Sequence, residues 1–284
     1  MGILLLFVAL FALNKVEASY FYARDVSTDS LLELALTNYH RYHSPEKNWL
    51  SLYAKPFFMQ STNHAPHYTR GGILFTGYIN LTKSIWVGIN SAAMQAQAGH
   101  LTAGGLDDIQ FKLAYDILML EDSHATAYLV GTAPTGNRPQ RSYEPHVGSK
   151  NGSFGLGLNV DMVAAEIMNY ELSLVGDLKY LYFFGSVINC LQKPVAYGNT
   201  INLWAGLCLP IHNNIIEVGY EFWWRHTSHR YNINASSQKL YLDLGYTPKN
   251  VRYSPIVGLG GSYEFATQNA LNVWTIWLTG GIIF

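Results

Sequence analysis

Residues 238–246 read QKLYLDLGY, and the apolar side chains in this stretch recur at every second position. Leu240 and Leu242 would lie on one face of an extended strand, while Lys239 and Asp243 would lie on the opposite face. Strict alternation of this kind indicates a β-strand whose two faces contact different surroundings. The fold therefore depends on whether the apolar face points into a core or outward into lipid.

The same period of two recurs along the chain and predicts about twelve antiparallel strands. Many of them run to about 10 to 13 residues, longer than the usual five or six of soluble proteins and close to the length of a tilted membrane strand. The predicted strands are residues 48–60, 71–80, 84–93, 106–118, 124–135, 152–161, 171–184, 200–209, 215–226, 238–246, 253–265 and 270–284.

Composition favours an apolar face that is turned outward. Only 13% of the 284 residues are charged and 49% are hydrophobic, whereas soluble domains carry about a quarter charged residues. A soluble sandwich or lipocalin-type barrel is the alternative, with its apolar face inside. Aromatic residues near strand ends, such as Phe222, Trp223 and Trp224, instead match a girdle at a membrane interface. The net charge of −1 gives no field that would attract nucleic acid.

The connections between the predicted strands fall into two classes. Those after even-numbered strands are short, whereas those after odd-numbered strands are mostly longer, including a loop at 94–105. Residues 162–169 are predicted to form a helical turn within one of the short connections. Short turns on one side and long loops on the other are typical of outer-membrane barrels. We therefore predict an all-β fold, a transmembrane antiparallel up-and-down β-barrel of about 12 strands in a bacterial outer membrane.

The two ends of the chain carry export and assembly signals. Residues 1–18 contain a short apolar run followed by small residues, and we predict a cleaved signal peptide. Residues 19–47 form a pre-barrel segment before the barrel at 48–284. The helical spacing within 28–43 fits a short plug of the lumen, and a periplasmic segment or an additional strand fits equally well. The terminal aromatic Phe284 is similar to the signal that Gram-negative barrels present to the barrel assembly machinery.

The charged residues on the polar faces must line the interior, because charges facing lipid are costly. We predict a pore lining for a small solute, with outer-membrane lipids outside, and we predict no cofactor, no metal site and no nucleic-acid partner. Charges that pair across strands and only hold the barrel shape are the alternative interpretation. The predicted lining is Asp108, Lys112, Asp116, Asp161, Asp177, Lys179, Glu217, Glu221, Arg225, Lys239, Asp243 and Glu264.

Three segments resemble a known family. The segments GLDDI at 105–109, YLVGTAPTGNRP at 128–139 and GSFGLGL at 152–158 look like the phenol-degradation-pathway (MetA-pathway) outer-membrane channel family. The sequence departs from the family pattern at Asp107, where Gly is usual, and at Ala133, where Leu is usual. The resemblance implies a barrel channel that passes small solutes, including hydrophobic compounds.

An enzyme is the alternative function. His226 and Ser228 would share one face of a strand, about 6 to 7 Å apart, and are similar to the base and nucleophile of outer-membrane phospholipase A. The Asn-Gly that follows the serine in that family is His229-Arg230 here, and no aligned residue would orient the histidine as a triad requires. The sequence therefore favours a channel over a lipid hydrolase, with a closed structural barrel as a third possibility.

Overall fold

The computed structural model describes residues 49–62, 68–120, 122–136, 147, 152–184, 186–188, 194–196, 199–226, 235–248, 254–268 and 272–284. The predicted signal peptide, the whole of the segment 19–47 with the helix predicted in it, and Ser228 lie outside these residues. Within the described ranges every regular element is a strand, and no helix is long and apolar enough to cross a membrane. The strands are β1 (Leu50–Ser61), β2 (Tyr68–Asn80), β3 (Ile85–Ala98), β4 (Leu101–Leu106), β5 (Ile109–Met119), β6 (Ser123–Ala133), β7 (Gly152–Ile167), β8 (Tyr170–Phe184), β9 (Ser186–Ile188), β10 (Pro194–Ala196), β11 (Asn199–Ile211), β12 (Asn214–His226), β13 (Ala235–Tyr246), β14 (Ser254–Gln268) and β15 (Val273–Ile283).

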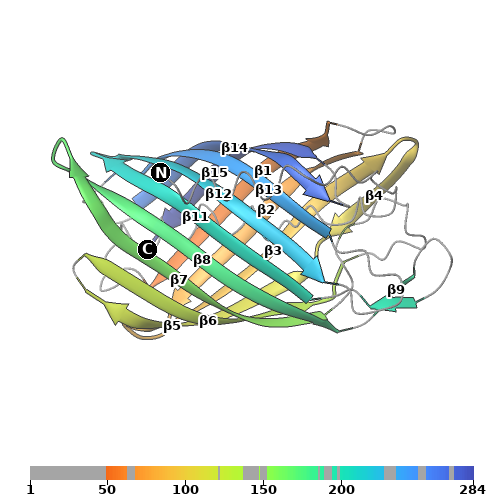
Figure 1. The fold of residues 1–284 in the computed structure, drawn as a ribbon, viewed down its shortest axis with the longest axis horizontal. Helices are drawn as coiled ribbons and strands as arrows, with labels where there is room; N and C mark the ends of the chain where they lie inside the picture. The colour runs from red at the N-terminus through yellow and green to blue at the C-terminus, as the bar shows by residue number, and fades with distance from the viewer. Residues whose placement is uncertain are drawn as a thin grey trace.

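The strands form a closed antiparallel barrel. One sheet contains 13 strands, and the pairing of β15 with β1 together with that of β2 with β3 closes it into a ring of 12 strands, with β4 as the one extra strand. Neighbours around the ring are consecutive in sequence, apart from the small β9–β10 hairpin and β4. The strands are tilted and wrap around a common axis (Figure 1). The predicted fold class is confirmed.

The two ends of the barrel differ as the connection lengths predicted. The end that carries the β2–β3, β5–β6, β7–β8 and β11–β12 turns is called the short-turn end here, and the opposite end is called the loop end. Figure 1 shows β4 and β9 together at the loop end.

The prediction of a loop at residues 94–105 is wrong. β3 continues to Ala98 and β4 begins at Leu101, with Gly99 at φ 60° in the tight turn between them. The small residues Ala92 and Ala96 are buried on the inner face of β3. Alternation of alanine with glutamine gives only a weak contrast in hydrophobicity between the two faces. The strand was therefore predicted to end too early, at residue 93.

The helical turn predicted at 162–169 is also wrong. β7 runs on to Ile167 and meets β8 through a two-residue turn in which Met168 and Asn169 have φ of 52° and 67°. Two positive φ angles are characteristic of a type I′ hairpin turn. This hairpin extends past the partner strands of β7 and β8, where both of its faces meet solvent, so its sequence loses the alternation of the wall.

The two faces of the wall have opposite polarity. Large apolar side chains such as Phe111, Leu156 and Leu178 are each about half exposed on the outside, while charged and aromatic side chains are buried inside. The predicted aromatic girdle is wrong at Trp223. This side chain is 6% exposed and lies inside the barrel, between its sequence neighbours Phe222 and Trp224. In a chain with a soluble core the exposed and buried sets would be exchanged.

Candidate functional site

The barrel interior holds nearly all of the predicted lining. Nine of the residues in that set are buried: Lys112, Asp177, Lys179, Glu217, Glu221, Arg225, Lys239, Asp243 and Glu264. The other three, Asp108, Asp116 and Asp161, are half-buried. The period of two thus placed these side chains on the inner face, although burial alone does not assign them a role in conduction.

Lys239 connects three neighbouring strands. It lies directly across from Glu221 on β12 and from Glu264 on β14, and its Nζ is 2.8 Å from Glu221 Oε2 and 3.6 Å from Glu264 Oε1. Asn202 Nδ2 donates a further hydrogen bond of 2.7 Å to Glu221 Oε1. Two carboxylates therefore share one ammonium group on this wall, and removal of Lys239 would leave both buried without it.

A second network lies on the wall formed by β5 to β8. Tyr128 donates from its hydroxyl to Asp177 Oδ1 at 2.8 Å, and Asn159 Nδ2 donates to Asp177 Oδ2 at 3.4 Å. The Nζ of Lys112 lies 3.6 Å from the centre of the Tyr128 ring and 5.3 Å from that of Trp86. Cation–π contacts in a desolvated site contribute about 2 kcal/mol or more. This wall therefore combines charge with aromatic surface.

Sequence reasoning missed several interior residues. Lys55 and Arg70 are buried on β1 and β2, at 2% and 5% exposure. Lys55 precedes Pro56 in an apolar stretch, and only the shared parity with Ser51 and Ser61 would have revealed that it faces inward. Interior aromatic residues such as Trp204 and Trp277 were also missed. Aromatic side chains occur on either face of an outer-membrane strand, so the residue type alone does not identify the face.

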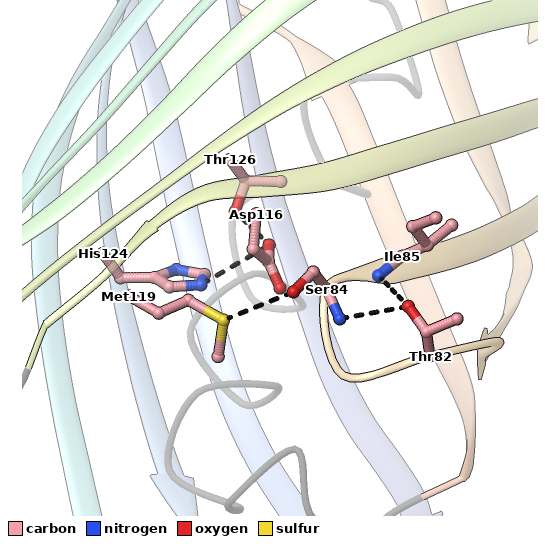
Figure 2. Close-up of polar contacts among 7 residues, drawn as sticks. All are labelled: Thr82, Ser84, Ile85, Asp116, Met119, His124 and Thr126. Atoms are coloured by element: carbon pink, nitrogen blue, oxygen red, sulfur yellow. Dashed lines mark hydrogen bonds and ion pairs between the residues drawn. The ribbon is translucent and has the colours of Figure 1, made fainter.

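Asp116 organises the short-turn end of β5 (Figure 2). Its Oδ1 accepts a hydrogen bond of 2.7 Å from Thr126 Oγ1 and lies 3.4 Å from His124 Nε2. The register between β5 and β6 shifts immediately beyond Asp116, and Ser84 contributes a backbone oxygen to the Asp116 amide at 2.9 Å. These contacts anchor the bulge where β5 leaves the regular ladder.

The segments that carry the family resemblance meet in space. Thr135 Oγ1 donates to the backbone oxygen of Asp107 at 3.0 Å and accepts from the Ile109 amide at 3.1 Å. The Gly136 amide donates to Asp108 Oδ1 at 2.8 Å. The end of β6 is therefore tied to the point where β4 gives way to β5. This part of the resemblance describes how the wall is built, and it assigns no solute.

Of the two residues of the enzyme alternative, the structure describes His226 but not Ser228. His226 is exposed at the end of β12 and stacks on Trp224, with 5.6 Å between the ring centres. The described residues also contain a histidine–carboxylate pair, His124 with Asp116, but Nδ1 of His124 has no hydrogen-bond partner. A catalytic triad has a nucleophile on the second ring nitrogen, and no such hydrogen bond is present at His124 in the described part of the chain. Nor do the described residues contain a cluster of three potential metal ligands.

Phe284 closes the ring. Its amide donates to the Leu50 oxygen at 2.9 Å, and its carbonyl accepts from the Trp49 amide at 3.1 Å. The last residue is therefore part of the seam between β15 and β1. Its role as an assembly signal remains a prediction.

Comparison with known proteins supports the fold. No family model and no curated protein matches the chain. The COG4313 outer membrane channel from Pseudomonas putida F1 superposes with a TM-score of 0.65 at 12% identity, over 84% of this chain and 96% of that chain. The chain has the fold of an outer-membrane channel. The NanC porin gives a TM-score of 0.53 at 9% identity, over 82% of this chain and 98% of that chain. The fold implied by the family resemblance is confirmed, and at these identities the likeness concerns the fold alone.

Proposed function

We propose that this chain is a channel of the bacterial outer membrane that passively conducts small solutes through the barrel interior. One observation carries the proposal: the polarity of the wall is inverted, with charged side chains buried and large apolar side chains exposed. A Lys or Arg facing lipid at mid-membrane costs about 2 to 4 kcal/mol. Every Lys and Arg in the described strands is buried, and such a wall suits a bilayer.

The interior chemistry supports conduction of polar or amphipathic solutes. Acidic residues such as Glu217 and Asp243 line one part of the wall, and Lys112 lies on β5, half-way around the ring from β13. A barrel of about this strand number encloses room for a narrow passage. The two solved proteins compared above carry the descriptions outer membrane channel and porin, which agrees with this proposal.

The test is solute flux through the refolded mature chain in liposomes, with single-channel conductance in planar bilayers. We expect conductance above the protein-free bilayer and flux of small solutes. Phospholipid breakdown is followed in the same vesicles, with Ser228→Ala as the matched variant. Lipid breakdown that is lost in Ser228→Ala would establish the hydrolase instead. Absence of conductance, solute flux and lipid breakdown would favour a closed structural barrel.

The proposal includes assembly through the C-terminal strand. Phe284 would present the terminal aromatic to the barrel assembly machinery before it joins the seam with β1. Deleting Phe284 should lower the amount of folded barrel in the outer membrane while leaving export to the periplasm intact. Equal membrane levels of the full and the shortened chain would refute this part of the proposal.

A further inference from the structure

We propose that Met119, His124 and Asp116 form a binding site for copper(I) at the short-turn end of the barrel. The site lies at the end of the wall, so it does not depend on conduction of solutes through the interior. The sequence predicted no metal site, and these three side chains come together only through the pairing of β5 with β6.

The β5–β6 hairpin brings the three side chains to one place. Met119 lies directly across from His124 in the register of the two strands, and Asp116 lies across from Thr126 on the other side of the bulge. Side chains in directly opposite positions share a face, with Cβ atoms about 4.5 to 5.5 Å apart. Figure 2 shows the Met119 sulfur, the His124 ring and the Asp116 carboxylate together beside Ser84. Nitrogen, oxygen and sulfur donors therefore meet at the end of this hairpin.

The His124 ring lacks a strong hydrogen bond. Its Nε2 lies 3.4 Å from Asp116 Oδ1, which is longer than the roughly 2.7 to 2.9 Å of a charge-assisted hydrogen bond. Its Nδ1 is buried and has no hydrogen-bond partner in the described part of the chain. Two ligand atoms that bind one tetrahedral metal, each about 2.1 Å from it, are about 3.4 Å from each other. The spacing between Nε2 and Oδ1 therefore suits two ligands of a shared metal ion.

Neighbouring hydroxyl groups hold the carboxylate and the sulfur in place. Thr126 Oγ1 donates to Asp116 Oδ1 at 2.7 Å, and Ser84 Oγ donates a weak hydrogen bond to Met119 Sδ at 3.9 Å. Hydrogen bonds of this kind orient the ligands of a metal site. The side chain of His124 is 27% exposed and Met119 is 45% exposed. The ligands are therefore both oriented and accessible to an ion in solution.

The sulfur atom selects the metal. Histidine, cysteine, aspartate and glutamate alone form no group of three that could hold a metal in the described residues, and His124 with Asp116 provides only two such ligands. Structural zinc and calcium sites need more ligands of these kinds. The third ligand here is the Met119 thioether, a soft donor that favours copper(I), and imidazole suits copper as well. The ligand set therefore indicates copper(I).

The experiment follows the methionine methyl groups by NMR in the refolded full chain in detergent, labelled with ¹³C at those methyl carbons. The probe is Ag⁺, which shares the charge and the ligand preference of copper(I) and is stable in air, added as its nitrate without chloride. Every sample carries Cys190→Ser and Cys208→Ala, because thiolates also bind soft metals. The matched control is the methyl group of Met162 on β7, which is 40% exposed and lies across from Ser123 near the same turn.

We expect the Met119 methyl signal to move until one equivalent of Ag⁺ has bound, while the Met162 signal stays in place. His124→Gln and Asp116→Asn should each weaken binding at Met119 by about tenfold or more. Met119→Leu keeps an apolar side chain and should remove one bound equivalent in calorimetry, which keeps the test decisive if another variant fails to fold. Equal movement of the Met119 and Met162 signals overturns the inference, as does a Met119 signal that does not move.

A second titration identifies the metal. Copper(I) added without oxygen should compete with Ag⁺ and move the same Met119 signal, and it should bind more tightly than Zn²⁺. Tighter binding of Zn²⁺, or failure of copper(I) to compete with Ag⁺, would overturn the assignment of this site to copper(I).

Discussion

The close contact between Gly157 and Tyr128 gives a sharp test of how the interior is built. A Cβ atom at Gly157 would overlap Cζ and Oη of Tyr128 and lie 2.6 Å from its Cε2. The ring has little room to move, because its hydroxyl is bound to Asp177 and the Lys112 ammonium group lies over its face. Gly157→Ala must therefore displace the ring and disturb both contacts.

The magnitude follows from those contacts. Forcing an extra methyl group into a packed interior costs about 1 to 3 kcal/mol. Loss of the Tyr128 hydroxyl from the buried Asp177 carboxylate adds about 1 to 3 kcal/mol. We expect Gly157→Ala to lower the free energy of unfolding by about 2 to 6 kcal/mol, measured by urea titration of the barrel in lipid vesicles. Gly131→Ala is the matched control, since its new Cβ would lie 3.7 Å from the Ser153 oxygen, an ordinary contact.

The refuting result is defined by a double-mutant cycle. In the Tyr128→Ala background the ring is gone, so adding Gly157→Ala should cost less than about 1 kcal/mol. If Gly157→Ala costs no more than Gly131→Ala, or costs as much with the ring removed as with it present, the steric argument is wrong.

Three further predictions concern charge and lipid. Lys239→Met leaves Glu221 and Glu264 without the ammonium group that they share and should lower the free energy of unfolding by about 3 to 5 kcal/mol; stability equal to wild type in urea titration would contradict this. Leu178→Arg on the outer face of β8 should cost about 2 to 4 kcal/mol in the same assay, whereas Tyr246→Arg at the end of β13 should cost about 0 to 1. Because acids outnumber bases in the predicted lining, the reversal potential across a KCl gradient should show K⁺ to be more permeant than Cl⁻, and the opposite sign would disprove the assignment of that lining.

The strands were predictable where bulky apolar residues alternate with polar ones. In β13, Leu240, Leu242 and Leu244 point outward and Lys239 and Asp243 point inward, as the sequence predicted. Prediction failed where that contrast fades, as in the run of alanine and glutamine that ends β3. It also failed beyond the edge of the wall, at the β7–β8 hairpin, because a hairpin exposed on both faces has no reason to alternate.

The pairing of interior charges could not be predicted. The alternation of residues determines on which face of a strand a side chain lies, but not which residue of the next strand lies opposite it. Sliding β13 by two residues against β12 would keep every inner residue inside and would place Glu217 across from Tyr241 or Gly245 instead of Asp243. The sequence alone gave no reason to choose among these registers. The observed register brings two acids together although alternatives that separate them preserve the same faces.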